Sequence, residues 1–208
     1  MNNSNKPNKT PYTHPPLRPD RRFLRRWVWG NTVGLGVGLT IGQLGASGML
    51  AGPLRLVAWG LAGVVVGSIQ QWLLRRQLAS NGWTWATMLG WLVGGVVAGG
   101  EGIDWGLMGG LIGLGQWVIL RRSVARAGWW LLANAMGLIF STLIGWSVRF
   151  SSRWTLFKTL FALLGERMVE LLDWGLAGLV SGAVAGAVTG LWLMWLLQAG
   201  GEHEIEPA

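Results

Sequence analysis

The sequence contains no cysteine and only two histidines in 208 residues. The lack of cysteine excludes disulfides, thiolate metal sites and cysteine nucleophiles. Both histidines, His14 and His203, lie in polar tails outside every apolar run. This placement excludes histidine-held haem or chlorophyll and histidine proton relays inside a membrane. We therefore expect neither a catalytic residue nor a metal site.

Charged residues are also scarce, at 12% of the chain against about 25% in soluble domains. Apolar residues reach 51%, and the mean hydropathy is +0.40. This number of charged residues is too small to cover a surface that faces water. We therefore expect an all-α integral membrane protein. The net charge of +8 comes from basic residues at the edges of apolar runs. Contact with lipid headgroups explains that position better than binding to nucleic acid.

Long apolar runs are present, and a helix needs about 20 such residues to cross a bilayer. The sequence predicts six transmembrane helices, over 27–48, 55–74, 83–100, 103–120, 129–148 and 174–197. They form a domain over 27–198, between a disordered basic tail (1–26) and a short acidic tail (199–208). In the linker 149–173, apolar residues recur every three or four positions but charges interrupt them. We expect this linker to be an amphipathic helix in the membrane interface.

Lysine and arginine predict the orientation of these spans. Six spans put both termini and two linkers on one side, which collects twelve of the 17 basic residues. Arginine pairs adjoin the spans on that side, at Arg75, Arg76, Arg121 and Arg122. The positive-inside rule therefore places both termini in the cytoplasm.

An internal repeat predicts three helical hairpins, over 27–76, 83–122 and 129–198. The motif Trp-Gly-Leu recurs in the even-numbered spans, beginning at Trp59, Trp105 and Trp174. In the odd-numbered spans a tryptophan stands seven positions before a glycine, with a polar residue between them: Trp27 with Asn31, Trp83 with Thr87, and Trp130 with Asn134. All three hairpins run in the same sense, which predicts parallel repeats around a pseudo-threefold axis.

The second and fourth spans close on similar segments, Gln71–Arg76 and Gln116–Arg122. This pattern resembles uncharacterised Gly/Trp-rich bacterial polytopic membrane proteins with repeated Gln-Trp-(apolar)-Arg-Arg helical hairpins. The resemblance covers about residues 27–150, and the third hairpin departs from it. It implies the membrane class, with the inner membrane of a bacterium as the expected location, and it transfers no activity.

Glycines recur every fourth residue in the first and sixth spans, at Gly30, Gly34, Gly38 and Gly42, and at Gly178, Gly182, Gly186 and Gly190. Four residues are about one helical turn, so each series lines one face of its helix. Inside lipid, such a face lets two backbones approach closely. We expect tight packing on these faces, either within the chain or against another protein.

Sixteen tryptophans are present, and most lie near the ends of the predicted spans. This distribution indicates anchoring at the membrane interface, because indole combines an apolar body with one N–H donor. Stacking against a quinone or another flat pigment is the alternative. No other cofactor is predicted.

Four carboxylates on the predicted outer side share the motif Glu-x-x-Asp-Trp-Gly-Leu, at Glu101, Asp104, Glu170 and Asp173. The simpler interpretation is capping, in which the aspartates accept hydrogen bonds from free N–H groups of a helix start. The alternative is an incomplete carboxylate ring at an outer mouth, which attracts cations or pairs with Arg55.

Polar residues within the spans predict hydrogen bonds between helices; they are Asn31, Gln43, Gln70, Gln71, Gln116 and Asn134. No ionisable residue falls near a span centre, which is unfavourable for a proton-coupled transporter. We therefore expect a non-catalytic packing, scaffold or accessory subunit of a membrane complex, with lipids and other subunits or itself as partners. The alternative is a facilitator for ions or small solutes, with a path among the three hairpins.

Overall fold

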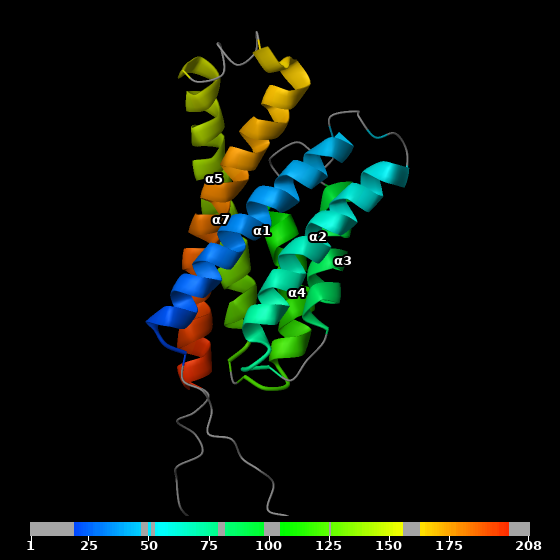
Figure 1. Ribbon diagram of the computed structural model, residues 1–208. Coiled ribbons are helices and arrows are strands. Elements are labelled where there is room, and N and C mark those ends of the chain that lie inside the picture. Colours follow the sequence, from blue (N-terminus) through cyan, green and yellow to red (C-terminus); the bar gives the residue numbers. More distant parts are fainter. Residues whose placement is uncertain are drawn as a thin grey trace, which may run out of the picture.

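The computed structural model describes residues 19–46, 50, 53–78, 82–97, 105–124, 126–155 and 163–199. Its long helices are α1 (Arg21–Ala46), α2 (Pro53–Leu74), α3 (Trp83–Val97), α4 (Trp105–Leu120), α5 (Trp129–Thr155) and α7 (Glu166–Ala199) (Figure 1). No strand occurs in the described ranges. The prediction of an all-α protein is therefore confirmed.

Three helices are long and apolar enough to cross a membrane, namely Pro53–Leu74, Trp129–Ser152 and Glu166–Ala199. Leu107–Leu120 is a shorter apolar helix. A bilayer core is about 30 Å thick, and each of the three longer helices exceeds that length at 1.5 Å per residue. These helices indicate a membrane protein.

The first helix begins at Arg21, six residues before the predicted span. The cause is a local cap, in which the backbone N–H of Phe23 donates to Oδ1 of Asp20 at 2.8 Å. Phe23 is buried, and its ring stacks on Trp27 with centroids 6.0 Å apart. Residues 21–26 are therefore helical and do not belong to a disordered tail.

The prediction of a separate interfacial helix over 149–173 is wrong. α5 continues to Thr155 and α7 begins at Glu166, so both ends of this segment extend the two neighbouring helices. Arg149 and Asp173, at the two ends of the segment, form an ion pair with each other. Residues 156–162 lie outside the described part of the chain.

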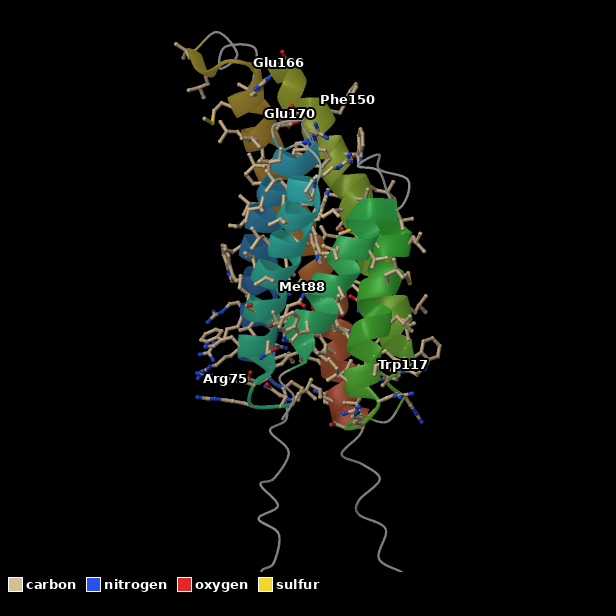
Figure 2. All side chains as sticks on the ribbon, turned by 90° about the vertical axis from the view of Figure 1, so that its right-hand side faces the viewer. Arg75, Met88, Trp117, Phe150, Glu166 and Glu170 are labelled. Atoms are coloured by element: carbon tan, nitrogen blue, oxygen red, sulfur yellow. The ribbon has the colours of Figure 1, made fainter. Side chains whose placement is uncertain are left out.

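The helices form a closed ring in chain order, in which each packs on the next and α7 packs on α1. The first residues of α1 and the last of α7 lie at the same end of the bundle, and α5 and α7 extend beyond the other helices at the opposite end (Figure 1). Figure 2 places Arg75 and Trp117 at the first end, here named the arginine end. Glu166 and Glu170 lie at the other, the glutamate end.

Glycine faces bring the backbones of adjacent helices together. A Cβ added at Gly178 of α7 would lie 2.6 Å from the carbonyl oxygen of Leu35 in α1, and one at Gly182 would overlap the carbonyl oxygen of Asn31. The glycine series of α1 faces α2 instead, with the site of a Cβ on Gly34 3.6 Å from Cα of Val66. The two series therefore pack within the chain, each against the next helix of the ring.

Candidate functional site

Each long helix contributes one buried polar residue to a single layer across the bundle. We call the set the polar layer; it consists of Asn31, Gln70, Thr87, Gln116, Asn134 and Thr189. Each member lies one turn from an apolar core cluster on either side along its helix, as Asn31 does between Trp27 and Leu35. The layer therefore lies between two apolar clusters, where an unmade hydrogen bond would be costly.

Side-chain amides connect the members of the polar layer. Nε2 of Gln70 donates to Oδ1 of Asn31 at 2.7 Å. Nε2 of Gln116 lies 3.1 Å from Oε1 of Gln70 and 2.9 Å from Oγ1 of Thr87, and donates to both. Asn134 donates to the backbone carbonyl of Trp130 one turn away, at 3.0 Å. Four helices are thus joined directly through side chains.

Three buried indoles complete the hydrogen bonding of the layer. In each case a tryptophan donates to the polar-layer residue of the preceding helix in the ring. Nε1 of Trp83 donates to Oε1 of Gln70 at 2.9 Å, and Nε1 of Trp130 to Oε1 of Gln116 at 3.0 Å. Nε1 of Trp27 donates to Oγ1 of Thr189 at 3.0 Å. The same contact therefore occurs three times around the ring of helices.

These three tryptophans are core residues, contrary to the prediction of interfacial anchoring. Trp27, Trp83 and Trp130 are 0%, 1% and 1% exposed, and the ring centroid of Trp130 lies 6.4 Å from that of Trp27 and 5.8 Å from that of Trp83. Each indole can be buried without leaving its N–H unpaired, because the polar layer accepts the hydrogen bond. Trp29 and Trp85, close in sequence, are each 64% exposed.

A cavity of about 30 Å³ lies beside the polar layer, lined by five of its residues together with apolar neighbours such as Leu35, Val66 and Ile112. This volume suffices for one or two water molecules, since a single water needs roughly 10–15 Å³. The cavity walls offer amide and hydroxyl groups. These groups can form hydrogen bonds, and none of them is charged.

A second polar site joins α5 and α7 near the glutamate end. Nε of Arg149 donates to Oδ2 of Asp173, and Oγ of Ser152 donates to Oδ1, both at 2.8 Å. Cζ of Arg149 lies 3.7 Å from the ring centroid of Trp174, a close cation–π contact. Arg149 is 8% exposed and Asp173 only 1%. The charges are therefore buried as a neutral, hydrogen-bonded pair.

This pair corrects the capping interpretation of Asp173. α7 begins at Glu166, so Asp173 lies two turns inside the helix, where the backbone N–H groups are already used. Its carboxylate is directed to Arg149 and does not face an open mouth. Glu170 accepts a hydrogen bond from Nε2 of Gln43 in α1 at 3.4 Å. Glu101 and Asp104 lie outside the described residues.

Sequence matching also assigned the wrong glutamine to one hairpin. Gln71 was aligned with Gln116, but Gln70 occupies the polar layer. Oε1 of Gln71 instead accepts the backbone N–H and the hydroxyl of Thr84 at the start of α3. Thr189 was missed. A signal was present, because Gln70, Gln116 and Thr189 each follow a glycine by three positions.

Few of the described residues are candidates for metal binding or catalysis. In the described part of the chain, no three histidine, aspartate or glutamate side chains come together in a way that could hold a metal ion. Comparison with protein family models, curated proteins and solved structures gives no match. Any assignment of function therefore depends on the geometry of the bundle.

Proposed function

We propose that the chain is a non-catalytic integral membrane protein with six transmembrane helices, which serves as a packing, scaffold or accessory subunit of a complex in the bacterial inner membrane. The polar layer carries this proposal. Its hydrogen bonds run from helix to helix, and three buried indoles donate to it. Such a layer favours one fixed arrangement of the helices, as a scaffold requires.

Six spans are proposed because α1, α3 and α4 share one ring with the three helices that are long and apolar enough to cross. α3 has 15 residues and α4 has 16, or about 22–24 Å at 1.5 Å per residue. A core of about 30 Å would therefore be thinned locally beside them. The cost of such mismatch is modest, and the neighbouring longer helices share it.

Three parallel hairpins are proposed because one contact recurs in each of them. In each case the first helix of a hairpin donates an indole N–H to the second helix of the preceding hairpin. The arginine end is assigned to the cytoplasm, because Arg75, Arg76, Arg121 and Arg122 are exposed there. Both termini are then cytoplasmic.

The outer surface of the bundle supports contact with lipids and with other subunits. Large apolar side chains are exposed along every helix, including Val37 on α1, Leu61 on α2 and Leu143 on α5. A soluble monomer does not expose apolar area on this scale. In a membrane the same surface meets acyl chains or partner helices, so lipids and other subunits, or further copies of this chain, are the proposed partners.

The test is the mass of the particle isolated from native membranes in a mild detergent. We expect a stable complex larger than the 22.6 kDa chain, with partners in fixed stoichiometry. A disrupting variant, Gly182→Leu, should break the contact between α1 and α7 and reduce the yield of complex. A monodisperse monomer of wild-type chain, with no partner at any detergent strength tested, would contradict the scaffold proposal.

A facilitator, the alternative function, would need a path through the polar-lined cavity among the helices. Proteoliposomes test it directly through osmotic shrinkage with glycerol or urea and through ion conductance. We expect rates equal to those of empty liposomes, since a cavity of about 30 Å³ offers no solute path. Flux above that level, reduced by Glu101→Gln with Asp104→Asn, would replace the scaffold proposal with a facilitator that has an acidic outer mouth.

A further inference from the structure

An apolar groove lies between α5 and α7 at the arginine end. It has a volume of about 410 Å³ and is lined by Trp129 at the start of α5 and by Leu191, Trp192 and Trp195 near the end of α7. The ring of Trp192 contacts both other tryptophans, with centroids 5.7 Å from Trp129 and 5.9 Å from Trp195. The size is typical of a site for a small organic ligand.

The tryptophans of this groove differ from those at the ends of α2 and α4. There an arginine lies over the indole, with Cζ of Arg75 5.2 Å from the centroid of Trp72 and Cζ of Arg121 5.1 Å from that of Trp117. The last turn of α7 has no basic residue. Trp129 is 48% exposed and Trp195 41% exposed, as a binding surface requires.

A basic residue, Arg126, precedes Trp129 by three positions in the turn that leads into α5. Arg126 is exposed, and its carbonyl oxygen accepts the N–H of Trp129 at 3.1 Å. The next residue, Ala127, is buried in the core, which fixes the turn. Arg126 has φ of 60°, and among the described non-glycine residues it alone has positive φ. An L-residue adopts this conformation at an energetic cost, so the turn positions Arg126 despite strain.

We propose that this groove binds an anionic glycerophospholipid of the cytoplasmic leaflet. An acyl chain lies along Trp129, Trp192 and Trp195, and the lipid phosphate pairs with Arg126. The inference rests on the membrane orientation given under Proposed function. Charge complementarity selects the occupant, because a guanidinium binds phosphate oxygens and basic sites between helices at the cytoplasmic side favour anionic headgroups. A partner helix would cover the indoles but offer Arg126 no phosphate.

Photo-crosslinking of the full chain in detergent tests this site. The probes are phosphatidylglycerol and phosphatidylcholine, each with a diazirine in one acyl chain, and the labelled residues are mapped by mass spectrometry. We expect phosphatidylglycerol to label residues 191–195 at least fivefold more than phosphatidylcholine. Arg126→Gln should reduce that preference to about onefold, while Arg126→Lys retains most of it. Trp195→Leu should reduce labelling by both probes.

Matched variants at the same end of the other two hairpins serve as controls. Arg76→Gln and Trp85→Leu change an exposed arginine and an exposed tryptophan away from the groove, and we expect wild-type labelling of 191–195 in both. Equal labelling by the two lipids, an unchanged preference in Arg126→Gln, or protection of the groove in a dimer would overturn the lipid site. Co-purification of partners does not depend on this result, so the scaffold proposal can fail while the lipid site stands, and the reverse.

Discussion

Trp27 and Thr189 lie 162 residues apart in the chain, yet the indole Nε1 of Trp27 donates to Oγ1 of Thr189 at 3.0 Å. The bond joins the first long helix to the last and closes the ring. Thr189 in turn donates to the carbonyl oxygen of Ala185 at 2.7 Å, which orients the hydroxyl oxygen as an acceptor. One short side chain therefore fixes the register between α1 and α7.

Replacing Thr189 with valine measures how much this hydrogen bond contributes to stability. The substitution keeps the side-chain shape but leaves the Trp27 N–H without an acceptor in an apolar core. We expect a loss of about 1–3 kcal/mol in the free energy of unfolding, seen as a lower melting temperature in detergent. Thr189→Ser keeps the acceptor and should stay close to wild type.

The control for this experiment is Thr142→Val, because the Thr142 hydroxyl donates only to the carbonyl oxygen of Leu138 on its own helix. If Thr189→Val were no more destabilising than Thr142→Val, the hydrogen bond between α1 and α7 would make no measurable contribution to stability.

Gly182 should tolerate no side chain, even a methyl group. A Cβ there would overlap the carbonyl oxygen of Asn31 and lie 2.7 Å from Cα of Thr32, and backbone atoms cannot move aside alone. We expect Gly182→Ala to force α1 and α7 apart, with a loss of about 1–3 kcal/mol. Gly110→Ala is the control, since a Cβ at Gly110 meets no atom within 4 Å. It should be neutral or slightly stabilising, because alanine is the better helix former.

Much of the fold could be predicted from the sequence because apolar runs and glycine spacing are local signals. α2 and α4 end at Leu74 and Leu120, as predicted, each directly before an arginine pair. The direction of packing could not be predicted. Gly34 and Gly182 look alike in sequence, but one faces α2 and the other faces α1, because only the closed ring determines which neighbour each face meets.

The polar layer could be predicted only in part, for a physical reason. Asn31, Gln70, Gln116 and Asn134 are conspicuous in apolar spans, because amides are costly to bury without partners. Thr189 is not conspicuous, since a threonine can bond to its own helix. The pairing of Arg149 with Asp173 could not be predicted, because a sequence does not reveal that two charges 24 residues apart meet in the interior.

The buried ion pair should be far more sensitive to the loss of one partner than to the loss of both. Asp173→Leu alone leaves the Arg149 guanidinium buried without its counter-charge, and we expect a loss of about 3–5 kcal/mol. The double variant Arg149→Met, Asp173→Leu removes both charges and should recover at least half of that loss. Thermal unfolding of the two single variants and the double variant gives the coupling energy.

An exposed carboxylate supplies the comparison for that cycle. Glu166 lies in the first turn of α7 and is exposed, so Glu166→Gln should change the stability by less than about 0.5 kcal/mol. Additive effects of Arg149→Met and Asp173→Leu would show that the two side chains do not depend on each other.

The orientation of the bundle can be tested because the chain has no cysteine of its own. Single cysteines at Ser123, at the arginine end, and at Glu166, at the glutamate end, place one exposed thiol on each side of the proposed span. A membrane-impermeant maleimide added to spheroplasts should label Glu166→Cys at once and Ser123→Cys only after permeabilisation. Both variants replace exposed residues, so neither should disturb the fold. Labelling of Ser123→Cys in sealed spheroplasts would place the arginine end outside the cell, against the positive-inside rule, and would remove the leaflet assigned to the lipid groove.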